Sequence, residues 1–311
     1  MKTYAFGVDV GGTTVKIGLF TTAGDLREKW EIPTVKNNGG VKIIPDIASS
    51  MLKKLDDLDI EKDDVAGVGI GVPGAVLRES IVNKCVNLGW GVKDVAAELS
   101  EALGGMEVKV GNDANVAALG EMWKGGGKGR KNIVMVTLGT GVGGGIIINE
   151  KIVPGNFGAG GEIGHICVDP GEKLACNCGR HGCLEQYASA TGISRLAREY
   201  LAAHPDEKTS LKADPSAKDV FDAYKKGDAA ATAIAEEVGD YLGRGLANVA
   251  DVVDPEVFVI GGGVSKAGQV LIDLIQKYYR QYVFHTSTDT EIVLAELGND
   301  AGMYGSVRLV L

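Results

Sequence analysis

Residues 5–20 read AFGVDVGGTTVKIGLF, and residues 133–149 repeat the same design as IVMVTLGTGVGGGIIIN. In each stretch, two runs of apolar and β-branched residues flank a glycine-rich break, which is the pattern of a β-hairpin with a polar tip. Because the design occurs twice, we predict an internal duplication in which one hairpin opens each of two α/β domains.

The rest of the chain alternates patterns typical of strands and helices. Before the second hairpin we expect helices over residues 41–58 and 92–103 and strands over residues 65–72 and 107–110. After it we expect helices over residues 188–204, 217–224 and 228–253, a buried strand over residues 257–260, and a helix from residue 267. Such alternation predicts a largely parallel sheet covered by helices.

The length of 311 residues exceeds what one hydrophobic core comfortably supports, so we expect two lobes. We predict a small α/β lobe over residues 1–116 and a large α/β lobe over residues 117–299. A C-terminal helix within residues 300–311 should pack back on the small lobe.

Composition narrows the function class. The net charge of −9 argues against broad electrostatic binding to nucleic acid or to anionic lipid. No run of about 18 apolar residues and no basic leader pattern is present, so we expect no membrane partner. Three of the five cysteines lie within residues 176–183, which fits metal binding in a reducing compartment better than disulfides. We therefore expect a cytoplasmic protein.

Residues 162–185 read EIGHICVDPGEKLACNCGRHGCLE and have the spacing of a structural zinc site. Three thiolates and one imidazole complete a tetrahedral Zn²⁺ shell with no open position, so the metal should hold the loop rather than activate water. The predicted ligands are His165, Cys176, Cys178 and Cys183. Cys167 and His181 are competing candidates, and Cys85 is expected to be a buried apolar residue.

The tips of the two hairpins are candidate phosphate-binding turns. Glycine lets backbone N–H groups approach phosphate oxygens, and threonine hydroxyls add donors. One such turn alone could be an ordinary hairpin, but a second related turn favours phosphate binding. The residues of the first turn are Asp9, Gly11, Gly12, Thr13 and Thr14, and those of the second are Gly139, Thr140 and Gly141.

Two further groups give weaker signals of phosphate or nucleotide binding. Lys16 could reach a phosphate, although a lysine after a turn is more often solvated. Residues 261–265, which include Gly262, Gly263, Val264 and Ser265, lie between a buried strand and a helix, where α/β sheets receive nucleotides, although tight turning also explains them.

Candidate site carboxylates occur at a strand–helix junction and at the two ends of the cysteine loop. Asn112 and Asp113 lie between the expected strand over residues 107–110 and a further expected helix over residues 114–123, so Asp113 is either a helix N-cap or a general base. Glu162 and Glu185 bracket the cysteine loop, where they are either solvated loop acids or polar groups that the metal holds in place.

Taken together, these motifs resemble the ROK family of bacterial sugar kinases (repressor, open reading frame, kinase), most of all its ATP-dependent glucokinases. The motifs follow one another in family order and span most of the chain: DVGGTTVK at 9–16, GNDAN at 111–115, LGTGVGGG at 138–145, GGEIGH at 160–165, CNCGRHGCLE at 176–185 and VIGGGVS at 259–265.

The resemblance implies a two-lobed actin-like ATPase (ribonuclease H-like) fold, with nucleotide and sugar in one cleft. It implies that Asp113 is the catalytic base. Sugar ligands would be Gly74, Asn112, Asp113, Glu162, His165 and Glu185, with His165 also binding zinc through its other ring nitrogen.

The expected reaction is transfer of the ATP γ-phosphoryl group to the 6-hydroxyl of glucose. Asp9 would orient Mg²⁺ through water, both glycine turns would bind phosphates, and residues 262–265 would line the adenosine site. The alternatives are a kinase for fructose, mannose or N-acetylmannosamine, a sugar-sensing regulator, and a zinc-binding interaction module. Because Asp9 lies so near the start of the chain, we expect no DNA-binding domain before it. We expect a homodimer or a homotetramer.

Overall fold

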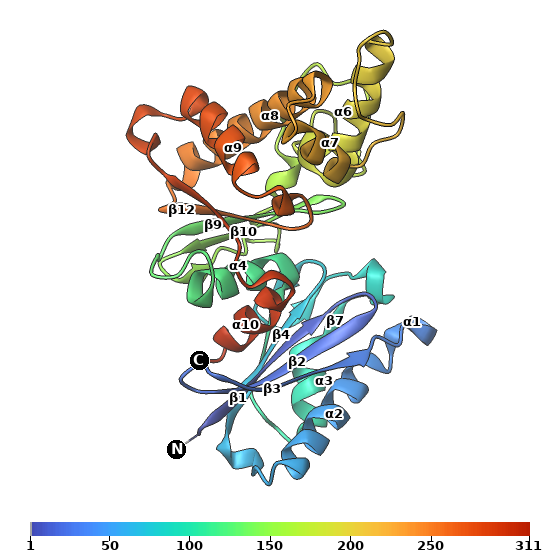
Figure 1. Ribbon diagram of the computed structural model, residues 1–311. Coiled ribbons are helices and arrows are strands. Elements are labelled where there is room, and N and C mark those ends of the chain that lie inside the picture. Colours follow the sequence, from blue (N-terminus) through green and yellow to red (C-terminus); the bar gives the residue numbers. More distant parts are fainter. Residues whose placement is uncertain (1) are drawn as a thin grey trace. The chain divides into compact units, whose positions relative to one another are not determined.

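A computed structural model describes residues 2–311, and its internal contacts divide the chain into two compact units (Figure 1). The first unit runs to Gly129 and also contains Gly145–Gly161 and Asn299–Leu311. The second contains Arg130–Gly144 and Glu162–Gly298. A lobe boundary after residue 116 stays a prediction.

The first unit is built on a five-stranded sheet of order β3-β2-β1-β4-β8. Strands β1, β4 and β8 are parallel, whereas β2 and β3 run antiparallel because short turns join them to β1 and to each other. The sheet is therefore mixed, with a parallel half and an antiparallel half. The strands are β1 (Tyr4–Val10), β2 (Thr14–Thr21), β3 (Leu26–Pro33), β4 (Val65–Val72) and β8 (Val108–Asn112).

Helices cover the sheet of the first unit. Helices α2 (Ile43–Asp57) and α3 (Val95–Ala102) contribute to the larger apolar core, and α10 (Ala301–Arg308) packs on β1, β4 and helix α4 (Asp113–Lys124). Helix α10 packs closely on β4 and α4. A Cβ on Gly69 would collide with the carbonyl of Ser306, and a Cβ on Gly305 would collide with the carbonyl of Val116. Strands β5 (Val76–Leu77), β6 (Ile81–Val82) and β7 (Lys93–Asp94) form a separate antiparallel sheet of order β5-β6-β7, and α1 (Asn37–Gly40) is a short helix.

A second sheet repeats this plan with the order β11-β10-β9-β12-β13. As in the first sheet, the strand that comes first in the chain lies at the centre, and two strands that run parallel lie on one side of it. The matching orders agree with the duplication expected from the two hairpins. The strands are β9 (Ile133–Leu138), β10 (Val142–Ile148), β11 (Lys151–Ile152), β12 (Val257–Gly261) and β13 (Glu291–Leu294).

The second unit is rich in helix, as the sequence predicted. Its main helices are α6 (Ala190–Ala203), α7 (Ala217–Tyr224), α8 (Ala229–Val253) and α9 (Gln269–Tyr282), and a short helix α5 (Glu185–Ala188) follows the cysteine loop. The expected helix from residue 267 begins at Gln269, after a 3₁₀ turn and Gly268, whose φ is +79°. Among residues 2–311, no helix combines the length and the apolar character needed to span a bilayer.

Candidate active site

The first glycine turn is closed by its own backbone and braced from a distant segment. The Gly11 N–H donates to the Thr14 carbonyl at 3.0 Å. Buried Thr34 donates through its hydroxyl to the Gly11 carbonyl at 2.7 Å and through its N–H to the Thr13 carbonyl at 2.8 Å. A fixed turn can present its remaining backbone N–H groups to an anion without reorganising.

Asp9 lies just before the last residue of β1, the strand that leads into this turn, and it is largely buried. A Cβ on Gly302 of α10 would lie 2.7 Å from the Asp9 carboxyl carbon, so only glycine leaves room for the carboxylate. Burial raises the pKa of Asp9 to about 6, and the charge of Asp113 adds to the shift while Lys16 opposes it. Lys16 lies opposite Asp9 in the hairpin and donates to the Asn299 carbonyl at 2.6 Å.

The Asn112–Asp113 pair lies where β8 passes into α4. Asn112 is the N-cap, because its side-chain oxygen accepts from the N–H groups of Ala114 and Asn115. Its amide donates to the Gly74 carbonyl and to Asp113 Oδ1, both at 3.0 Å. Asp113 Oδ1 also accepts from the Ala114 N–H at 2.8 Å. The capping role thus falls to Asn112, and the Asp113 carboxylate is oriented by two donors.

The second glycine turn is braced in the same manner within the second unit. The Gly139 N–H donates to the Gly141 carbonyl at 2.9 Å. The start of α6 holds the turn from outside, since the Ala190 N–H donates to the Gly139 carbonyl at 2.8 Å and the Thr191 hydroxyl to the Thr140 carbonyl at 2.9 Å. Two turns of related sequence are therefore fixed by unrelated partners.

Residues 262–265 lie next to this second turn. Gly262 has a φ of +86° and follows β12, and a Cβ there would lie 2.5 Å from the carbonyl oxygen of Leu138, which immediately precedes Gly139. A Cβ on Gly263 would meet nothing, and Ser265 donates its hydroxyl to the Gly262 carbonyl at 2.8 Å. The predicted adenosine loop and the predicted phosphate turn are thus neighbours.

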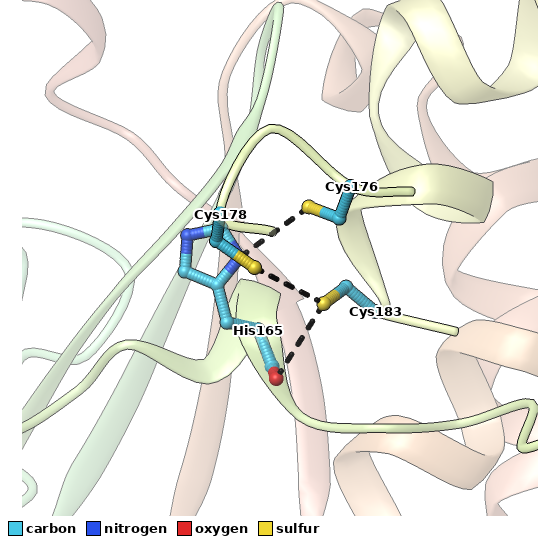
Figure 2. Close-up of side chains that lie close together, drawn as sticks. All are labelled: His165, Cys176, Cys178 and Cys183. Carbon is cyan, nitrogen blue, oxygen red and sulfur yellow. Dashed lines mark hydrogen bonds between the residues drawn. The ribbon is translucent and has the colours of Figure 1, made fainter. Parts of the chain in front are cut away.

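His165, Cys176, Cys178 and Cys183 converge, and their ligand atoms all lie within 4.8 Å of one another (Figure 2). His165 Nδ1 lies 3.8 Å from Cys176 Sγ, and the Sγ atoms of Cys178 and Cys183 are 3.6 Å apart. Tetrahedral Zn–S bonds of about 2.3 Å separate two sulfur ligands by roughly 3.8 Å, so the cluster fits a zinc ion. Cys167 and His181 are not members of the group.

The thiols of this cluster differ in acidity without a metal. Hydrogen bonding, chiefly from the Arg180 backbone N–H, lowers the pKa of Cys178 to about 6. Burial is the main reason that the pKa of Cys183 is raised to about 12. A thiolate at Cys178 therefore forms readily at neutral pH, whereas ionisation of Cys183 requires a compensating positive charge such as a metal ion.

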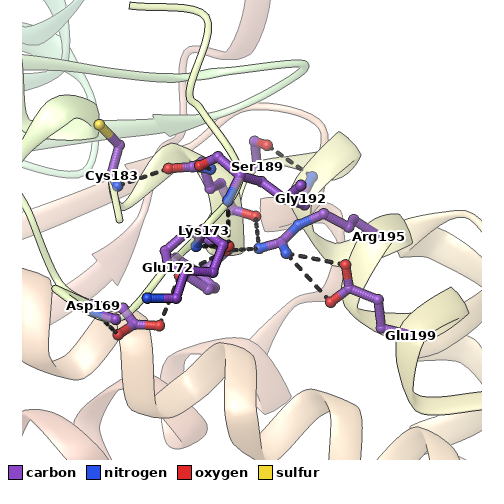
Figure 3. A network of polar contacts seen from close by, with 12 residues as sticks. Asp169, Glu172, Lys173, Cys183, Ser189, Gly192, Arg195 and Glu199 are labelled. Atoms are coloured by element: carbon purple, nitrogen blue, oxygen red, sulfur yellow. Dashed lines mark hydrogen bonds and ion pairs between the residues drawn. The ribbon is translucent and has the colours of Figure 1, made fainter. Parts of the chain in front are cut away.

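A polar network also anchors the cysteine loop to the helices after it (Figure 3). The Tyr187 hydroxyl lies 3.0 Å from an Asp169 carboxylate oxygen and 2.9 Å from one of Glu172. Arg195 of α6 forms an ion pair with Glu172 at 3.0 Å. The Cys183 N–H donates to the Gln186 side chain at 3.0 Å. The loop is thus held by side chains as well as by its predicted metal.

Glu185 joins the metal cluster to the second glycine turn. One of its carboxylate oxygens accepts from the Val142 N–H at 2.9 Å, and the other lies 3.8 Å from Cys176 Sγ. Gly141 has no Cβ, and a Cβ at this position would collide with the Glu185 carboxylate. Glu162, by contrast, is exposed, and its side chain makes no hydrogen bond with residues 2–311.

Comparison with known proteins decides the family. The ROK family profile matches residues 5–311. The chain belongs to the ROK family. It is 46% identical over 310 residues to a glucokinase of Halalkalibacterium halodurans, covering 98% of this chain and 94% of the relative. It is 37% identical over 316 residues to a glucokinase of Thermotoga maritima, covering 99% of this chain and 98% of the relative.

A solved structure agrees with this assignment. A ROK family glucokinase from Streptomyces griseus, crystallised with glucose and AMPPNP, has a TM-score of 0.74 and 33% identity, with 98% of each chain covered. The actin-like ATPase fold predicted from the motifs is thereby confirmed for this ROK chain.

Each unit of this ROK protein collects part of the predicted site. The first unit holds Asp9, the first turn, Gly74, Asn112 and Asp113, and the second holds the second turn, residues 262–265 and the cysteine cluster with its acids. Sequence reasoning missed Thr34, Thr191 and Gly302, which brace the turns or make room for Asp9. No local pattern marks them, because each acts on a residue far away in the chain.

Proposed function

We propose that this ROK chain is an ATP-dependent glucokinase that transfers the γ-phosphoryl group of ATP to the 6-hydroxyl of glucose. The observation that carries the proposal is the Asn112–Asp113 pair, in which two donors orient a strand-end carboxylate in the same unit as a phosphate turn. The two glucokinase relatives support glucose as the substrate.

Asp113 accepts the proton of the attacking hydroxyl in this proposal, and Asn112 has two roles. Its amide holds Oδ1 of Asp113 and the Gly74 carbonyl, so the base and the neighbouring backbone keep a fixed geometry. The backbone N–H groups of both glycine turns stabilise the negative charge on the transferring phosphate. Positioning and electrostatics account for most of the catalysis of phosphoryl transfer.

ATP with Mg²⁺ and a structural Zn²⁺ are the proposed cofactors. Asp9 would hold Mg²⁺ through water, and bound Mg²⁺ would neutralise phosphate charge. His165, Cys176, Cys178 and Cys183 would hold zinc, since their spacing fits a closed tetrahedral shell. With Nδ1 of His165 facing the cluster, Nε2 is left to donate to a hexose hydroxyl. Glu162 and Glu185 would accept hydrogen bonds from other hydroxyls.

A hexose panel tests the proposal. Purified protein is mixed with Mg·ATP and glucose, fructose, mannose or N-acetylmannosamine in turn, and ADP release is followed by a coupled assay. We expect glucose to give the highest kcat/KM, and we expect the kcat with glucose to fall by roughly 10²–10⁴ in the Asp113→Asn variant. A higher kcat/KM with another hexose would assign the chain to that sugar, and ADP release with none would leave a sugar-sensing regulator.

Two further properties accompany this proposal. A cytoplasmic location is proposed because a three-thiolate metal site needs a reducing compartment. A homodimer or homotetramer is proposed, and light scattering after size exclusion distinguishes the two by mass.

A further inference from the structure

A cavity of about 810 Å³ lies in the first unit, and none of its lining residues belongs to the glycine turns or to the cysteine cluster. Its wall comprises the β5–β6 turn, the edge strand β8, the start of α4, the β10–β11 turn and the C-terminal end of the chain. The volume lies within the range of roughly 300–1,000 Å³ typical of small-molecule sites. Among the lining residues, Asn112 alone belongs to the proposed hexose site.

The wall of this cavity is positively charged, whereas the whole chain has a net charge of −9. Three anionic groups, which are the side chains of Glu79 and Glu150 and the terminal carboxylate of Leu311, are outnumbered by four cations. The cations are Arg78, Lys109, Lys151 and Arg308. Concentrated positive charge on an acidic protein attracts an anion to that place.

Two of the four cations are already engaged. Arg308 donates to the terminal carboxylate of Leu311 at 2.7 Å and lies 3.9 Å from Glu150. Lys109 lies 4.0 Å from Glu107. The side chains of Arg78 and Lys151 make no hydrogen bond or ion pair with any residue from 2 to 311. They are therefore able to bind a ligand without first breaking a protein contact.

Backbone strain is concentrated at the same cavity. Seven non-glycine residues among those described have positive φ, and four of them line this wall: Arg78 (55°), Glu79 (53°), Asn149 (52°) and Glu150 (64°). Tight hairpin turns usually place asparagine and glycine there, and arginine or glutamate is uncommon. Strained turns persist where the surroundings hold them, and they cluster at ligand sites.

The two strained turns carry the two free cations. Arg78 is in the β5–β6 turn, closed by the Ser80 N–H donating to the Leu77 carbonyl at 3.2 Å. Lys151 directly follows the β10–β11 turn and pairs with Ile148. Because tight turns fix the backbone at both residues, their side chains start from fixed positions on the cavity wall.

We propose that this cavity binds a small organic phosphate. The planar guanidinium of Arg78 matches two phosphate oxygens at once, and the ammonium of Lys151 supplies a second positive charge. Val76, Ile152 and Leu309 provide apolar wall for the carbon skeleton. Such a ligand would lie beside Asn112, at the strand end that carries the proposed base.

The test is calorimetric titration of the full chain with glucose 6-phosphate while glucose and AMPPNP are saturating, so that the proposed active site is occupied. We expect a binding event with a Kd below about 1 mM. The double variant R78Q/K151Q should weaken glucose 6-phosphate binding at least about tenfold. The Arg78→Lys variant keeps the positive charge but loses the planar guanidinium, and it should weaken binding less. Thermal melting verifies that each variant is folded.

The matched control is K53Q/R280Q, which removes the same two charges from exposed positions without ion pairs. This variant should bind like the wild type. The proposal is overturned if the wild type shows no second event, if both double variants lose binding equally, or if citrate binds as tightly as glucose 6-phosphate. Failure of glucose and AMPPNP to bind would count against the glucokinase proposal alone. The comparison of the two double variants would still test the cavity proposal in that case.

Discussion

At the residue scale, Asp113 is held by donors that do not depend on its negative charge. An asparagine at this position could still accept from the Ala114 N–H, so Asp113→Asn should fold normally and bind glucose. Its kcat should fall by roughly 10²–10⁴, the usual loss for a general base. Steady-state kinetics and a melting curve measure both effects. Retention of a tenth of the wild-type kcat would show that Asp113 is not the base.

Asp9 predicts a pH dependence of stability. Burial raises its pKa from 3.8 to about 6 in the folded chain, so folding favours the protonated form. The stabilisation from that protonation is complete below pH 3.8 and is lost as the pH rises through 6. At pH 8 the ionised group then costs on the order of 2–3 kcal/mol, because one pKa unit is about 1.4 kcal/mol.

Asp9→Asn removes this buried charge and should therefore melt at a higher temperature than the wild type at pH 8. The gain should shrink as the pH falls toward 4, where the wild-type carboxyl is largely protonated. Calorimetric scans at about pH 4.5, 6 and 8, which lie below, at and above the pKa of about 6, measure the difference in melting temperature between the variant and the wild type. An equal gain in melting temperature at all three pH values would mean that removal of the buried charge does not cause the gain.

At the scale of elements, the cysteine loop should depend on its metal. We predict one zinc per chain, and Cys178→Ser should lose it because a closed tetrahedral site tolerates no missing thiolate. Cys167→Ser is the matched control, since Cys167 lies in the same loop but outside the ligand group. Elemental analysis of the two variants decides, and zinc retained in Cys178→Ser but lost in Cys167→Ser would reverse the ligand assignment.

Glu185 extends this effect from the loop to the second glycine turn. Its carboxylate accepts from the Val142 N–H and lies beside Cys176, so loss of the metal should loosen both the proposed hexose site and the turn. We therefore expect Cys178→Ser to raise both the KM for ATP and the KM for glucose. Each should rise roughly tenfold, which is the usual size of effect when residues that hold a metal site in place are changed. A change in the KM for glucose alone would mean that Glu185 does not transmit the effect.

At the scale of the whole molecule, the proposed ligands are shared between two units. Asn112 and Asp113 belong to the first, and Glu162, His165 and Glu185 to the second. The family resemblance implies that one hexose binds both groups, so hexose binding would complete the site, whereas water could not. ATP hydrolysis without hexose should therefore be at least about a hundredfold slower than the glucose-driven rate. Comparable ADP release with and without glucose would contradict this.

The sequence by itself determined most of the secondary-structure elements of this protein, and it predicted the residues of the site from their local patterns. Helix α7 occupies the expected residues 217–224, and α8 and β12 begin and end within one residue of their predicted bounds. Apolar periodicity, helix caps and glycine turns are local properties, readable over a few residues. The spacing of the three cysteines and His165 likewise indicated the ligand group that the fold brings together.

Only the tertiary structure decided which residues support these features. Thr34 braces a turn more than twenty positions earlier in the chain, and Gly302 makes room for Asp9 from the far end of the sequence. The cavity cations Arg78 and Lys151 belong to separate hairpins, and nothing in either local pattern relates one to the other. Such pairings depend on which surfaces pack together, and packing is set by the shape of the whole core rather than by neighbouring residues.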